Sequence, residues 1–213
     1  MIIIFDLDGT VLDTFELIRI NFIETFKNYL PEYKYTENDL KSFFGPGLRD
    51  TFKSICCNEE KAEELIIKYQ ELTLDLQKKY LKSFPDSDYV LAKLKDYGFK
   101  LAIFSNKIHK AIVSGLEQMN LIQYFDLIIG IDEVDYPKPN PQGIYMVKEF
   151  LNDEKCIYVG DTKIDIETAI NANIDAVGVS YALTKKEDLF KAGAKFVASS
   201  MKDLLKIMEK NYV

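Results

Sequence analysis

The stretch Ile2-Ile3-Ile4-Phe5-Asp6-Leu7-Asp8-Gly9-Thr10, at the start of the chain, decides the fold. Its first four residues form an apolar run without polar alternation, as expected for a strand buried on both faces of a parallel sheet. The run stops at Asp6, and Asp8-Gly9-Thr10 follows as a turn. Open α/β sheets bind their ligands beyond the carboxyl ends of the strands. The stretch therefore predicts a central strand that leads directly into a site.

Asp6 and Asp8 place two carboxylates close together after this strand. At about 4 Å and an effective dielectric constant of about 20, two such charges repel by about 4 kcal/mol. A cation between them relieves the repulsion, and Mg²⁺ is a hard cation that carboxylate and carbonyl oxygens bind. Asp and Gly are also common turn formers. However, the fixed pattern Asp-x-Asp-Gly-Thr should arise by chance on the order of once in 10⁵ positions at ordinary composition, so we interpret both aspartates as functional.

The composition is that of an ordinary soluble globular chain. Its 213 residues are 47% hydrophobic and 29% charged, which suffices for one sizeable core and a small second module. The formal net charge of -7 argues against nucleic acid or an anionic membrane as the main partner. No apolar run approaches the roughly 18 residues of a membrane span, and the first residues lack the basic region of a signal peptide.

The cysteines indicate a reducing compartment. Cys56, Cys57 and Cys156 are odd in number and two are adjacent, which fits free thiols. We expect Cys56 and Cys57 to be buried packing residues. The sequence thus predicts a cytoplasmic protein, and we expect a monomer or homodimer.

Residues 14–83 have helical rather than alternating periodicity. Apolar residues recur at three- and four-residue spacing, Thr36 and Asn58 are good helix starts, and Gly45-Pro46-Gly47 interrupts the pattern. Strand–helix alternation flanks this stretch on both sides. We therefore predict two domains: an α/β catalytic core of residues 1–13 and 84–213, and a helical insertion of residues 14–83.

After residue 84, apolar runs alternate with helical segments. Runs at 101–104, 125–129, 156–159 and 176–179 predict buried strands, and 196–197 predicts a final short one. This alternation predicts an α/β fold, a Rossmann-like parallel sheet with helices on both faces.

Polar residues stand where four of these strands end. In chain order they are Asp6 and Asp8, then Ser105 and Asn106, then Lys138, then Asp161 and Asp165. A parallel sheet brings such ends to one edge, so these groups should converge. A carboxylate nucleophile, oxygen-binding donors, a cation and a second positive charge are what phosphoryl transfer needs.

The motif Asp6-x-Asp8-Gly9-Thr10 resembles the signature of the haloacid dehalogenase-like phosphatases, and the later motifs follow that family's order over nearly the whole chain. The resemblance implies that Asp6 is the nucleophile that becomes aspartyl-phosphate and that Asp8 is a general acid and base. Family members that cleave carbon–halogen or phosphonate bonds lack a carboxylate at the second position. The resemblance therefore implies phosphoryl transfer.

The resemblance also implies which residues bind phosphate. Ser105, with Asn106, matches a phosphate-binding hydroxyl after the second strand, and Lys138 matches a lysine that contacts the nucleophile and phosphoryl oxygens. We assign Thr10 to phosphate binding as well. Taken alone, Ser105-Asn106 would more often be a helix cap, and Lys138 a solvated loop lysine.

The family's metal is Mg²⁺, and the resemblance implies a set of ligands for it. Asp6, a backbone carbonyl at Asp8 and the Asp161 carboxylate would hold the ion, and Asp165 would be a ligand or a partner of the ligands. The helical insertion resembles the family's cap, which opens and closes over the core.

Within the family, the layout most resembles the phosphoglycolate phosphatase branch, which implies a small phosphorylated metabolite as substrate. Phe44-Gly45-Pro46-Gly47-Leu48 looks like the cap loop that meets substrate, so we predict Gly45 and Arg49 as substrate-binding residues. Asn173 and the segment 180–183 depart from the family by lacking glycine. His109, the single histidine, we expect on a helix surface near the rim of the site.

Other functions stay open. A pyrophosphatase or 5'-nucleotidase of the same branch would share these motifs, as would a phosphomutase of the β-phosphoglucomutase type. A phospho-acceptor signalling module is the non-enzyme alternative, although its phosphorylated aspartate follows a later strand and it carries no helical insertion. A catalytically silent binding protein would lack some of the catalytic residues present here.

Overall fold

The computed structural model describes residues 1–56 and 58–213, so Cys57, expected to be buried, lies outside the described residues. Contacts divide the chain into two compact units, Met1–Asp13 with Ser83–Val213 and Thr14–Lys82. We call the first the core unit and the second the helical unit. Ser83, which we expected with the helices, belongs to the core unit. Within the described ranges, no helix is both long and apolar enough to span a membrane.

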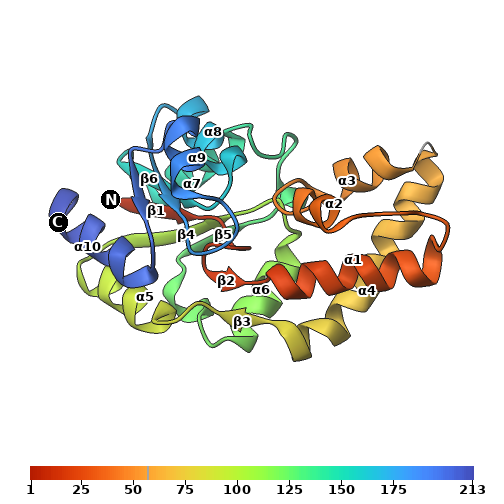
Figure 1. Cartoon of the computed structure of the whole chain (residues 1–213). Coiled ribbons are helices and arrows are strands. Elements are labelled where there is room, and N and C mark those ends of the chain that lie inside the picture. Colours follow the sequence, from red (N-terminus) through yellow and green to blue (C-terminus); the bar gives the residue numbers. More distant parts are fainter. Residues whose placement is uncertain (57) are drawn as a thin grey trace. The chain divides into compact units, whose positions relative to one another are not determined.

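The core unit is built on a six-stranded parallel sheet with the order β5-β4-β1-β6-β7-β8 (Figure 1). The strands are β1 (Ile2–Phe5), β4 (Lys100–Phe104), β5 (Leu127–Ile129), β6 (Cys156–Gly160), β7 (Asp175–Val179) and β8 (Phe196–Ala198). β1 is central, with Ile4 opposite both Ala102 of β4 and Tyr158 of β6. All four residues of β1 are buried, so the predicted doubly covered central strand and parallel sheet are confirmed.

Helices cover the sheet. α7 (Gln142–Leu151), α8 (Lys163–Asn171) and α9 (Lys186–Ala192) pack against the face that carries Ile2 and Ile4. α5 (Ser87–Asp96) and α10 (Met201–Asn211) pack together and lie on the other side in Figure 1, while α6 (His109–Gln118) packs on β5. Short 3-10 turns, η1 (Ile122–Tyr124) and η2 (Ile131–Glu133), flank β5.

The helical unit contains α1 (Phe15–Tyr29), α2 (Glu37–Ser42), α3 (Leu48–Ile55) and α4 (Glu59–Tyr80). Thr36 and Asn58 cap α2 and α4 through their side chains, which confirms both predicted helix starts. The interior is aromatic: the Phe22 ring lies 4.8 Å from Tyr69 and 5.6 Å from Phe52, centroid to centroid.

Two details differ from expectation. Cys56 is half-buried at the end of α3 rather than buried. α9 was not predicted, because only Leu189 of its seven residues is buried and the segment therefore lacks a periodic apolar face. A second, two-stranded sheet consists of β2 (Leu12–Asp13) and β3 (Lys82–Ser83).

Candidate active site

Three carboxylates converge at the carboxyl edge of the sheet. Asp6 directly follows β1 and Asp161 directly follows β6, the neighbouring strand in register with it. Asp165 lies on the first turn of α8. Each offers a carboxylate oxygen, these oxygens lie within 4.8 Å of one another, and all three residues are buried. Residues more than 150 positions apart are thus brought together as the parallel sheet requires.

The ammonium group of Lys138 lies inside this cluster. Its Nζ is 2.9 Å from Asp6 Oδ1 and 2.6 Å from Asp165 Oδ1, and it donates to the Tyr158 hydroxyl at 3.1 Å. Asn106 fixes the lysine backbone, since its Oδ1 accepts from Lys138 N at 2.9 Å and its Nδ2 donates to Lys138 O at 3.4 Å. In this structure Asn106 therefore positions Lys138, and its expected contact with phosphate stays a prediction.

The cluster has more negative than positive groups. Burial, with the Asp165 and Asp8 carboxylates adding to it, raises the pKa of Asp6 to about 6 although Lys138 opposes the shift. Burial, together with Asp165 and Asp6, raises the pKa of Asp161 well above its ordinary value. Burial alone would lower the pKa of Lys138, but the carboxylates of Asp165 and Asp6 raise it well above the usual value. Such a site favours an additional cation.

Asp161 offers an oxygen suited to that cation. Thr10 Oγ1 donates to Asp161 Oδ1 at 3.2 Å, whereas the buried Oδ2 has no hydrogen-bond partner among the described residues. Asp165 is more fully engaged: Oδ1 faces Lys138, and Oδ2 accepts from the backbone and hydroxyl of Thr162 at 2.9 and 2.6 Å. Hard carboxylate oxygens of this kind fit a hard divalent cation such as Mg²⁺.

Two glycines allow the carboxylates of the cluster to lie close to the backbone. Gly9 has φ of +78°, and a Cβ there would collide with the Asp161 carboxylate. A Cβ at Gly160 would collide with the side chain of Asp165. The Asp-x-Asp-Gly and Gly-Asp spacings therefore have a steric reason in this structure.

Asp8 stands apart from the cluster. Its carboxylate is half-buried, and the Nζ of Lys107 lies 2.9 and 3.1 Å from its two oxygens. Ser105 follows β4 directly and is buried, with its backbone N–H donating to Ile129 O at 3.1 Å. The structure thus gathers the residues expected at the strand ends at one edge of the sheet of the core unit.

A family model described as haloacid dehalogenase-like hydrolase matches residues 3–179. The chain belongs to this family. A Listeria innocua protein named Pyrophosphatase PpaX is 35% identical over 208 residues, covering 97% of this chain and 95% of that protein. The expected family, and with it an enzyme of hydrolase class, is confirmed.

Solved structures agree with the family assignment. A predicted phosphatase from Clostridium acetobutylicum is 29% identical, with a TM-score of 0.83 and coverage of 98% of this chain and 97% of that one. A predicted phosphoglycolate phosphatase from Haemophilus somnus is 20% identical, with a TM-score of 0.86 and 97% of both chains covered. At that identity the second likeness shows the fold alone.

Within this haloacid dehalogenase-like site, three residues were not predicted from the sequence. Lys107 pairs with Asp8. The Tyr158 hydroxyl donates to Phe104 O at 2.6 Å and accepts from Lys138, and the Tyr181 hydroxyl donates to Thr10 O at 2.7 Å. A signal for Tyr158 existed, because a tyrosine within a buried strand requires a partner for its hydroxyl.

Of the remaining candidates, Gly45 and Arg49 belong to the helical unit and His109 belongs to the core unit. Gly45, with φ of +102°, lies between α2 and α3. Arg49 of α3 pairs with Glu63 of α4 at 2.8 Å, so its role toward substrate stays a prediction. His109 begins α6, and its Nδ1 lies 2.7 Å from Glu133 Oε2.

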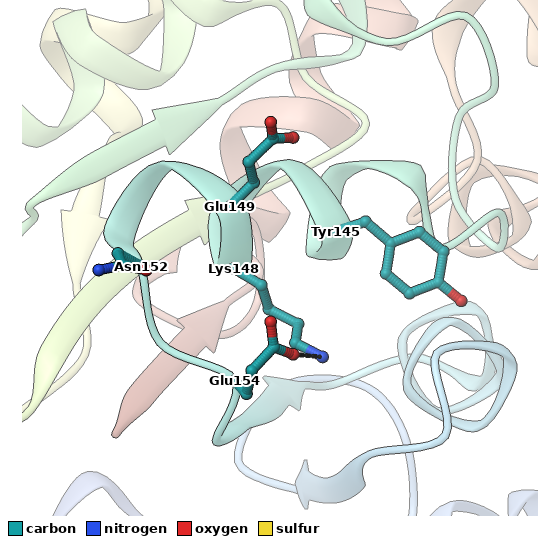
Figure 2. A pocket seen from close by; sticks show the side chains of 5 residues that line it. All are labelled: Tyr145, Lys148, Glu149, Asn152 and Glu154. Atoms are coloured by element: carbon teal, nitrogen blue, oxygen red, sulfur yellow. Dashed lines mark ion pairs between the residues drawn. The ribbon is translucent and has the colours of Figure 1, made fainter.

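Figure 2 shows a surface hollow lined by Tyr145, Lys148, Glu149, Asn152 and Glu154. These residues belong to the end of α7 and the loop that enters β6. The hollow therefore lies at the amino end of β6, opposite the end that carries Asp161. None of the five residues is buried, and the ion pair drawn there, Lys148–Glu154 at 2.8 Å, is solvent-exposed on the glutamate side. The hollow is therefore separate from the edge of the sheet at which Asp6 and Asp161 meet.

Proposed function

We propose that this chain is a Mg²⁺-dependent phosphatase that hydrolyses a small phosphorylated metabolite through an aspartyl-phosphate on Asp6. The observation that carries the proposal is the buried cluster in which Asp6 lies 2.9 Å from Lys138 and beside Asp161, whose Oδ2 lacks a partner among the described residues. Family membership and the phosphatase and pyrophosphatase names of its relatives support it. Because the proposed substrates are small phosphorylated metabolites, we also propose that the protein is cytoplasmic.

The first chemical step forms the phosphoenzyme. An oxygen of Asp6 bonds to phosphorus while the bond from phosphorus to the leaving oxygen breaks, and Asp8 delivers its proton to that oxygen. The Lys138 ammonium stabilises charge on Asp6 and the phosphoryl oxygens. We assign Ser105 and Thr10 to the phosphate oxygens.

The second step releases phosphate. The Asp8 carboxylate takes a proton from water, the water oxygen bonds to phosphorus, and the bond between phosphorus and Asp6 breaks. Asp6, Asp161 and the backbone carbonyl of Asp8 would hold Mg²⁺, which when bound supplies positive charge against the phosphoryl oxygens. Asp165 orients Lys138 through its 2.6 Å contact and would lie beside the metal ligands rather than among them, since both its oxygens are engaged.

Two substrate classes have support. The layout of the motifs favours a phosphate monoester of the phosphoglycolate kind. Inorganic pyrophosphate is the second candidate, because relatives from Listeria and Bacillus named Pyrophosphatase PpaX are 33–35% identical over 97% of this chain. We also propose that the helical unit is the family's cap and that Gly45 and Arg49 contribute to substrate binding from it.

The proposal is tested with a substrate panel and one variant. Purified protein with Mg²⁺, and with EDTA instead, is assayed on 2-phosphoglycolate, pyrophosphate, a 5'-nucleotide and p-nitrophenyl phosphate. We expect Mg²⁺-dependent release of phosphate and a loss of on the order of 10⁴-fold or more in Asp6→Asn, because the nucleophile is gone. Asp96→Asn, which changes an exposed carboxylate on α5, is the matched control and should keep full activity. Turnover by Asp6→Asn at the wild-type rate would show that Asp6 is not the nucleophile.

A further inference from the structure

Lys107 and Asp8 form an ion pair that the fold, rather than local sequence, creates. The lysine Nζ contacts both carboxylate oxygens, the two residues are 99 positions apart, and their side chains are only 17% and 19% exposed. By contrast, Lys61 and Glu64 of the helical unit are three positions apart, with side chains 34% and 51% exposed. Pairs of that second kind form on any helix surface and contribute little.

Hydrogen bonds hold the backbone on both sides of Lys107 and at Lys107 itself. Lys107 O accepts from Ile131 N at 3.0 Å. On either side, Ser105 N donates to Ile129 O at 3.1 Å, and His109 N donates to Asp132 Oδ1 at 2.7 Å. The segment after β4 is therefore fastened to the end of β5 and to η2. A charged group on a fixed anchor can hold its partner within a narrow range of positions.

The two aspartates of the motif thus have separate lysines. Asp6 contacts Lys138, which is buried and shared with Asp165. Asp8 contacts Lys107 at the half-buried rim of the site. A contact to both oxygens restricts rotation of the Asp8 carboxyl group about its last torsion, which is otherwise broad.

We propose that Lys107 is a positioning residue for proton transfer: it holds the Asp8 carboxyl group where it can deliver a proton to the leaving oxygen. This inference rests on the proposed function, in which that proton passes from Asp8 to the leaving oxygen as the phosphorus–oxygen bond breaks. Removing the lysine should therefore slow the reaction most when the leaving oxygen most needs a proton.

The test compares phenyl phosphate with p-nitrophenyl phosphate. The leaving group of the second substrate is p-nitrophenolate, a stabilised anion that needs less protonation than phenolate. In Lys107→Met we expect kcat/KM for phenyl phosphate to fall roughly 10- to 100-fold, because a misplaced acid loses much of its contribution. The loss on p-nitrophenyl phosphate should be clearly smaller. Lys107→Arg, which can also contact both oxygens, should restore most of the activity, whereas the exposed Lys110→Met should behave as wild type.

A double-mutant cycle tests whether Lys107 acts through Asp8. In an Asp8→Asn background, Lys107→Met should cause no further loss, because the group it positions is already gone. Equal losses on both substrates, or full additivity with Asp8→Asn, would overturn the inference. If Asp8→Asn itself hydrolyses phenyl phosphate normally, the proposed function fails instead, which separates the two failures.

Discussion

The core unit and the helical unit treat charge in opposite ways. The core unit buries Asp6, Asp161, Asp165 and Lys138 together. In the described part of the helical unit no charged residue is buried, and its hydrophobic core consists of aromatic and aliphatic side chains. Burying charges usually costs stability compared with apolar packing. We infer that the core unit retains its buried charges for the proposed chemistry, while the helical unit is built for packing.

The largest effect on stability should follow from removing the buried lysine. Lys138→Met leaves three buried carboxylates without their ammonium group, so we expect kcat to fall about 10²- to 10³-fold or more. In EDTA the free energy of unfolding should fall by about 3–5 kcal/mol, the usual result of breaking a buried ion pair from one side. Urea unfolding and steady-state kinetics measure both.

The matched control comes from the helical unit. Lys78→Met removes a lysine whose side chain is 75% exposed, and it should change neither quantity appreciably. Similar stability losses in the two variants would show that the supposed contrast between the units is wrong.

Packing in the helical unit should be nearly as sensitive. Phe22 is fully buried and contacts the rings of Phe52 and Tyr69, so Phe22→Ala should lower the free energy of unfolding by about 3–5 kcal/mol. Ile67→Ala, at a side chain 54% exposed, should stay within about 0.5 kcal/mol. Circular dichroism during urea unfolding compares them, and an unchanged midpoint in Phe22→Ala would contradict the assignment of this core.

Removing the Asp161 carboxylate of the core unit should change stability in opposite directions with and without Mg²⁺. Mg²⁺ at 100 times its Kd should stabilise the wild type by about 2.7 kcal/mol through mass action. Asp161→Asn should remove most of that gain, because the unpartnered Oδ2 is lost as a ligand. In EDTA the same variant should be more stable than wild type, since it relieves one of three buried carboxylates. Thermal melts with and without Mg²⁺ test both signs, and an undiminished Mg²⁺ response would exclude Asp161 as a ligand.

Part of the fold and of the candidate site could be predicted from the sequence. The apolar run of β1 and the polar residues at strand ends follow from the physics of parallel sheets, and they located Asp6 and Asp161 correctly at one edge. Lys138 was recognised through its motif, because nothing in a Pro-rich loop indicates burial. The Lys107–Asp8 pair was missed, since it depends on how the end of β4 meets the turn after β1. α9 was missed because a short helix with one buried residue leaves no periodic pattern.

The smallest effect on stability should come from Arg49, where the helical unit has a functional prediction. Its ion pair with Glu63 joins side chains 59% and 38% exposed, so Arg49→Ala should cost less than about 1 kcal/mol. If Arg49 binds the substrate's distal anionic group, KM for that substrate should rise about 10-fold or more while the unfolding midpoint barely moves. Glu63→Gln is the matched control, because it breaks the same pair and leaves the guanidinium in place. Equal KM values in Arg49→Ala, Glu63→Gln and wild type would make the arginine one more exposed charge on a unit built for packing.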